Sequence, residues 1–173
     1  MLKHQTAALF FCAAVAAVAA VASPLSAFAQ NAPPQSVKWE LQVLQDGQQI
    51  DSFTGTTAVG QARTDTHHHV VKNNVGCADK PAGDIDLQRT LTLSPVHANA
   101  DDITLQIDAQ ETLQESSAPV TAAGCKLPPQ PRQINAAHPG LVLKPGEWST
   151  WQIVDKNPTL TYKVRATLAT AAQ

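Results

Sequence analysis

Apolar and polar residues alternate along most of this chain with a period of two, which is typical of half-buried β-strands. The clearest run has one side made of Val37, Trp39, Leu41 and Val43, with Lys38, Glu40 and Gln42 between them. Asp46-Gly47 follows, a dipeptide suited to the positive φ angles of a tight hairpin turn. The sequence therefore predicts a hairpin whose second strand covers residues 50–54, with Trp39 in the core.

The same alternation predicts further strands over residues 62–72, 85–93, 103–109, 141–143, 148–154 and 160–168. Pro95 is expected to end the strand before it, because proline cannot donate a hydrogen bond to a central ladder. Residues 114–133, rich in Ser, Ala, Pro and Gln, are predicted to be irregular. Seven or eight short strands joined by turns predict an all-β fold, an antiparallel β-sandwich or an open barrel.

The first 29 residues have the layout of a cleavable secretory signal. Lys3 and His4 precede an apolar run from Ala7 to Ala22, and Ala27-Phe28-Ala29 supplies the small residues of a cleavage site. The run is shorter than the roughly 20 apolar residues of a spanning helix. We expect residues 1–29 to be removed, which leaves one soluble domain, residues 30–173, in the periplasm or outside the cell, without stable membrane insertion.

Removal of the signal leaves two of the three cysteines, Cys77 and Cys125, each preceded by glycine. An even pair in loops of an exported protein predicts a disulfide, which would contribute about 4 kcal/mol in the chain-entropy model. A free reactive thiol is the alternative.

The charge of the predicted domain argues against two classes of partner. Without Lys3 there are 11 Lys and Arg residues against 14 Asp and Glu residues, a net charge of −3. The basic residues are scattered, so neither nucleic acid nor an anionic membrane surface is expected as a partner. The expected partner is another protein or a component of the envelope or of a host.

The segment 64–70 (TDTHHHV) carries the strongest candidate for chemistry. In a strand, Asp65, His67 and His69 project from one face, whereas His68 projects from the other. Imidazole and carboxylate groups are ligands for zinc, copper or nickel, so this face is a candidate transition-metal site. The alternative is an ordinary polar strand face, and no other cofactor is expected.

Two further features bear on function. Trp148 and Trp151 are three residues apart and fall on opposite faces of a regular strand, so one of them is a candidate partner contact. The alternative is that a bulge or strand end lets both pack inside. The chain has no Gly-x-Ser-x-Gly, His-Glu-x-x-His or phosphate-binding glycine motif, so catalytic activity is not expected. A pocket that gathers two or more titratable groups would favour an enzyme instead.

Residues 90–109 (TLTLSPVHANADDITLQIDA) form a strand ending in proline, a polar loop and a second alternating strand. This segment resembles hairpins in the β-domain of outer-membrane secretins, and residues 53–60 (FTGTTAVG) are similar in character. The resemblance implies an accessory role at the bacterial cell envelope and carries over no site residue. We therefore predict an exported, non-catalytic binding or accessory protein, with a periplasmic metal-binding protein and an enzyme as alternatives.

Overall fold

The computed structural model describes residues 35–72, 84–115 and 119–169. These residues form eight strands within one compact unit, residues 32–173. The strands are β1 (Ser36–Gln45), β2 (Gln48–Ala58), β3 (Arg63–Lys72), β4 (Asp84–Ala98), β5 (Ile103–Gln114), β6 (Pro131–Leu143), β7 (Ser149–Val154) and β8 (Leu160–Leu168). Within the described ranges, no helix has the length and apolar character needed to cross a membrane.

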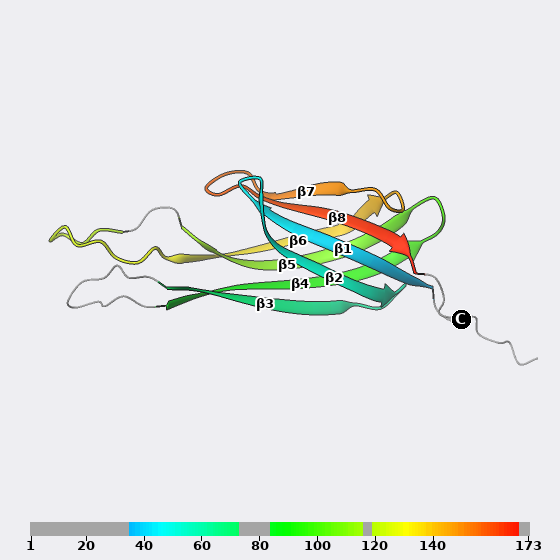
Figure 1. Cartoon of the computed structure of the whole chain (residues 1–173), viewed down its shortest axis with the longest axis horizontal. Helices are drawn as coiled ribbons and strands as arrows, with labels where there is room; N and C mark the ends of the chain where they lie inside the picture. The colour runs from blue at the N-terminus through cyan, green and yellow to red at the C-terminus, as the bar shows by residue number, and fades with distance from the viewer. Residues whose placement is uncertain (1–34, 73–83, 116–118, 170–173) are drawn as a thin grey trace, which may run out of the picture. The chain divides into compact units, whose positions relative to one another are not determined.

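The strands build two four-stranded antiparallel sheets, with the orders β2-β1-β8-β7 and β3-β4-β5-β6. We call them sheet A and sheet B. Figure 1 shows sheet A lying against sheet B. The all-β, sandwich-like prediction is therefore confirmed. The predicted turn is also confirmed, since Asp46 and Gly47 both have positive φ and join β1 to β2.

The core lies between the sheets and follows the alternation of the sequence. Inward side chains of β1, β4, β5 and β8 are almost all buried and apolar. Trp39 is the largest of them, and its indole nitrogen donates a hydrogen bond to Oγ1 of Thr57 at 3.0 Å. Its ring lies directly over Gly55, where a Cβ atom would come within 2.6 Å of Cζ2. Trp39 is thus a core residue, as predicted, and it requires glycine on the neighbouring strand.

Among the strand boundaries that differ from the prediction, two involve proline. β4 does not end before Pro95 but continues to Ala98, with a register shift between Pro95 and His97. β3 pairs with β4 only as far as Leu93, so the missing N–H of Pro95 removes no bond from that side. β6 begins at Pro131, ten residues before the predicted start, and it is an edge strand, where proline is tolerated.

Sheet B continues past the end of sheet A. The β1–β2 turn ends sheet A on one side, whereas β3 runs to Lys72 and β4 begins at Asp84, and Figure 1 shows the strands of sheet B extending beyond that turn. Among the described strands, none of sheet A therefore covers the inward face of this projecting part of sheet B. The predicted signal peptide and Cys77 lie outside the described residues, so cleavage and the Cys77–Cys125 disulfide stay predictions.

Candidate functional site

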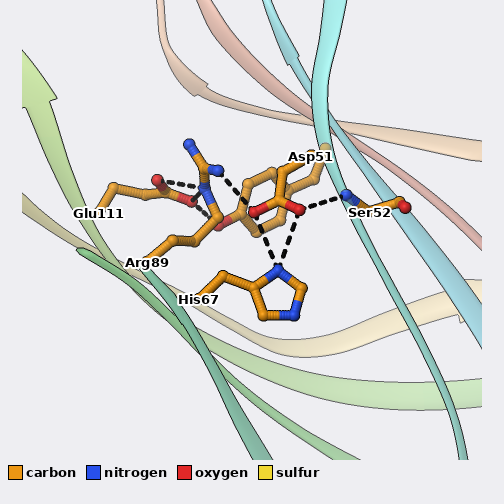
Figure 2. Close-up of polar contacts among 6 residues, drawn as sticks. Asp51, Ser52, His67, Arg89 and Glu111 are labelled. Carbon is orange, nitrogen blue, oxygen red and sulfur yellow. Dashed lines mark hydrogen bonds and ion pairs between the residues drawn. The ribbon is translucent and has the colours of Figure 1, made fainter. Parts of the chain in front are cut away.

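A row of polar side chains crosses the space between the sheets where sheet A ends. In sheet B, the register places His67, Arg89 and Glu111 side by side on β3, β4 and β5. In sheet A, Asp51 and Tyr162 flank Val43 of β1 on the facing row. We call Asp51, His67, Arg89, Glu111 and Tyr162 the polar row; Figure 2 shows its contacts.

Asp51 on the edge strand β2 links the two sheets. Oδ2 accepts a hydrogen bond from Nη1 of Arg89 at 2.8 Å, and Oδ1 accepts one from the backbone N–H of Ser52 at 2.7 Å. Nδ1 of His67 lies 3.0 and 3.1 Å from the two carboxylate oxygens. Burial alone would raise the pKa of Asp51, but the hydrogen bonds from Arg89, His67 and Ser52 outweigh it and leave that pKa below its ordinary value.

Glu111 is the most buried charged residue of the polar row. Its two carboxylate oxygens accept from Nε of Arg89 at 2.8 and 2.6 Å, and the hydroxyl of Tyr162 donates to Oε1. Burial raises the pKa of Glu111, and the charge of Arg89 and the hydrogen bond from Tyr162 only partly offset it. All of these contacts come from donors, which suits an ionised carboxylate.

The pKa values of Arg89 and Tyr162, the two partners of Glu111, are shifted in the directions that keep both side chains as hydrogen-bond donors. Burial would lower the pKa of Arg89, but the charge of Glu111 and the hydrogen bonds to Asp51 and Glu111 raise it instead. Burial, together with the charge of Glu111, raises the pKa of Tyr162 far above the ordinary value for a phenol. The guanidinium thus stays charged and the phenol stays neutral, so both remain donors to the carboxylate.

His67 stands at the exposed end of the polar row. Its ring stacks on Phe53 of β2, with the ring centroids 4.1 Å apart and the planes inclined by 16°. Phe53 on one face and Asp51 at Nδ1 together fix the orientation of the imidazole. The opposite ring nitrogen, Nε2, points away from Asp51 (Figure 2).

A cleft of about 690 Å³ opens beside the polar row. Its floor is the uncovered inward face of sheet B, and Gln45 and Ile50 of sheet A form a wall. The apolar lining residues are Ile50, Val71, Leu87 and Leu113, and the polar ones include Asp51, His67, His69 and Arg89. An apolar floor with a few fixed polar groups at one end is the usual composition of a ligand site.

Two of the three predicted metal ligands form ion pairs with other residues, and their role as metal ligands stays a prediction. Asp65, His67 and His69 do lie on one face of β3, but Asp65 forms an ion pair with Arg63 at 2.8 Å and His67 is bound to Asp51. In the part of the chain that the structure describes, no three His, Cys, Asp or Glu side chains gather closely enough to hold a metal ion. His67 and His69 instead both line the cleft.

The two tryptophans lie on opposite sides of sheet A. Trp151 is partly buried against the core, and its ring meets Tyr162 and His138 edge-on at centroid distances of 5.7 and 5.4 Å. Trp148 packs instead against outward-facing cations, with Arg165 4.6 Å and Lys163 5.7 Å from its ring centroid. Only one of the two therefore packs inside, and the role of Trp148 as a partner contact stays a prediction.

Asp51, Arg89, Glu111 and Tyr162 were not predicted as site residues, although part of the signal was present. Arg89 stands between Leu87 and Leu91, and Glu111 stands between Ala109 and Leu113, at positions that the alternation directs inward. Two opposite charges on the apolar faces of neighbouring strands indicate a buried ion pair. Asp51 has no such signal, because it becomes a partner only when the sheets pack.

Comparisons with protein families, curated proteins and solved structures found no match to this chain. The secretin-like segment does form a hairpin, β4 and β5, but an antiparallel hairpin alone does not define a family.

Proposed function

We propose that this protein is an exported, non-catalytic binding protein of the cell envelope or secreted milieu, and that it holds an amphipathic ligand in the cleft beside the polar row. The observation that carries the proposal is the cleft itself, which combines an uncovered apolar floor with side chains fixed by Asp51. Holding polar groups rigid before a ligand arrives lowers the entropy that binding must offset.

The binding proposal can be tested with Nile red, a neutral dye whose fluorescence rises in apolar surroundings. The double variant Ile50→Asn with Val71→Asn makes the cleft lining polar, and we expect it to weaken dye binding about tenfold or more. Val142→Asn is the matched control, because Val142 is 63 % exposed on β6 and does not line the cleft. Dye binding that is absent from the wild type, or equal in all three proteins, would refute the proposal.

An enzyme is the second candidate, because the cleft gathers several titratable groups. The bond between Asp51 and Nδ1 of His67 leaves Nε2 available, as in a general base. Among the described residues of the cleft lining, the only hydroxyl groups belong to Thr66 and Thr112, and none of these residues is a serine, cysteine or lysine. A hydrolase would therefore use His67 to activate water, so ester-hydrolysis activity in the wild type that His67→Gln abolishes would support it.

We further propose the Cys77–Cys125 disulfide. The β3–β4 connection, which contains Cys77, joins Lys72 to Asp84, and the β5–β6 connection, which contains Cys125, joins Gln114 to Pro131. Because the strands are antiparallel neighbours, both connections leave sheet B at the same end. Titration of two free thiols in the exported, unreduced protein would refute the pairing.

A further inference from the structure

His67 is the part of the polar row that a ligand in the cleft meets first. Its side chain is 45 % exposed, compared with 12 % for Arg89 and 1 % for Glu111. Asp51 lies between the imidazole and the guanidinium, as Figure 2 shows. Although His67 and Arg89 both line the cleft, a ligand head group at its inner end therefore meets the more exposed imidazole before the guanidinium.

The contacts of His67 fix the tautomer of its neutral imidazole, in which Nε2 is the hydrogen-bond acceptor. Asp51 already accepts from Arg89 and from the backbone of Ser52, so its carboxylate is ionised and has no proton to donate. Nδ1 of His67 must therefore carry the hydrogen of the bond to Asp51. In the neutral imidazole the lone pair is then on Nε2.

The charges of the polar row do not cancel. Asp51 and Glu111 contribute two carboxylates, and within the described ranges Arg89 is the only Lys or Arg residue bound to them. Among the residues that the structure describes, the lining of the cleft contains no Asp, Glu, Lys or Arg residue other than Asp51 and Arg89. With a neutral His67, the inner end of the cleft thus carries one net negative charge in a partly buried place, where attraction to a cation is stronger than in water.

We propose that the ligand of the cleft is an amphipathic amine, whose ammonium group donates a hydrogen bond to Nε2 of His67 and balances the charge of the polar row. Its apolar body lies on Leu87, Leu113 and Val71 and against Ile50. This inference rests on the proposed binding function and names the chemical class of its ligand.

The test compares three probes that share one tail and differ only in the head group. They are octylammonium, 1-octanol and octanoate, which are positive, neutral and negative at neutral pH. Isothermal titration calorimetry gives the dissociation constant of each with the mature wild-type domain. We expect octylammonium to bind at least tenfold more tightly than 1-octanol, since a hydrogen bond to a charged group contributes more than a neutral one, and octanoate to bind most weakly.

Variants of His67 test whether the imidazole causes the preference for octylammonium over 1-octanol. His67→Phe keeps an aromatic ring against Phe53 and removes both nitrogens, whereas His67→Asn gives up the ring, keeps an N–H near the position of Nδ1 and has no acceptor at the position of Nε2. In each we expect the tenfold preference for octylammonium to disappear. His97→Phe is the matched control, because His97 is an exposed histidine of β4 outside the cleft lining, and it should keep the wild-type ranking.

The ranking in the wild type decides the inference even if both His67 variants fail to fold. Equal binding of the three probes, or tightest binding of octanoate, would overturn the amine proposal and leave the binding function standing. Absence of binding by all three, together with the absence of Nile red binding, would overturn the binding function itself.

Discussion

The space between the two sheets has an apolar half and a polar half, and the two halves are built on the same strands. In the apolar half, Leu91 and Leu93 of β4 face Ile107 and Ala109 of β5 across the register, and all four are buried. Two residues further along each strand, on the same face, Arg89 of β4 faces Glu111 of β5. The backbone ladder is the same, so only the side chains make the difference.

The two halves place different demands on their neighbours. An apolar side chain needs only a cavity of suitable volume, and it tolerates exchange for another of similar size. A buried ion needs particular partners at hydrogen-bond distance, because an unpaired charge in the interior costs far more than the pair contributes. The polar half is therefore the part of the core where the positions of single atoms are fixed, which is the property that a binding site needs.

Exchange of Arg89 for methionine would give the largest effect. Arg89→Met leaves Glu111 and Asp51 without their cation, and we expect it to lower the free energy of unfolding by about 3–5 kcal/mol in denaturant titrations. The matched control is Leu91→Met, which puts the same residue two positions further along the same inward face and should cost less than about 1.5 kcal/mol.

A second variant distinguishes charge from packing in this comparison. Addition of Glu111→Gln to Arg89→Met removes the unpaired carboxylate while retaining an acceptor for Tyr162. We expect it to restore at least half of the lost stability. If the double variant is as unstable as Arg89→Met alone, the loss comes from packing, and the contrast between the two halves is weaker than we argue.

The apolar half is sensitive to volume instead, and Gly55 is the place to show it. A Cβ atom there would meet Cζ2 and Cε2 of the buried Trp39 ring at 2.6 and 2.9 Å. Gly55→Ala should therefore destabilise the protein by about 1–3 kcal/mol, the usual cost of overpacking. Gly140→Ala is the control, since its nearest contact outside the neighbouring residues is Thr104 at 3.8 Å. Equal unfolding midpoints of the two variants would show that the Trp39 ring can move aside.

An alkaline titration should show how strongly the polar half of the core disfavours ionisation of the Tyr162 hydroxyl. It is the only tyrosine in the chain, so tyrosinate absorbance reports on this hydroxyl alone. Its pKa is raised in the folded state from the ordinary value of 10.0. Its contribution to stability is therefore fully present below about pH 10 and falls above it, by about 1.4 kcal/mol per pH unit, while only the unfolded chain ionises.

The measurement combines absorbance with unfolding at a series of pH values. No tyrosinate signal should appear in the folded protein near pH 10, although the denatured chain titrates there. In Tyr162→Phe the alkaline loss of stability should be smaller by the amount that this one group contributes. A folded-state midpoint close to pH 10 would mean that Tyr162 does not donate to Glu111.

The alternation of the sequence predicted most strands and the apolar side of several, because the period of a strand is a local property. It therefore placed Trp39 in the core and put Asp65, His67 and His69 on one face. It found only the end of β6, residues 141–143, because the first inward residues of that strand, Arg132 and Ile134, form no apolar stripe. An edge strand is held by its neighbour, so its own pattern is weak.

The polar row was less predictable than the strands. Arg89 and Glu111 could have been paired from their inward positions on neighbouring strands. The role of His67 could not, because Asp51 and Phe53 reach it from the other sheet, and no local pattern sets how one sheet packs on another. The metal hypothesis, which stays a prediction, did not include the ion pairs that Arg63 and Asp51 form with two of its three ligands.

The smallest expected effect lies outside the core, at Trp148. Its ring packs against the half-buried, outward-facing cations Lys163 and Arg165, and cation–π contacts at the surface contribute about 0.5–1 kcal/mol. Trp148→Ala should therefore cost no more than that, whereas Trp151→Ala removes contacts with Tyr162 and should cost clearly more. A double-mutant cycle of Trp148→Ala with Arg165→Gln should give a coupling energy in the same small range. A larger coupling would mean that the outer face of sheet A is also a structural element, which would weaken the prediction of Trp148 as a partner contact.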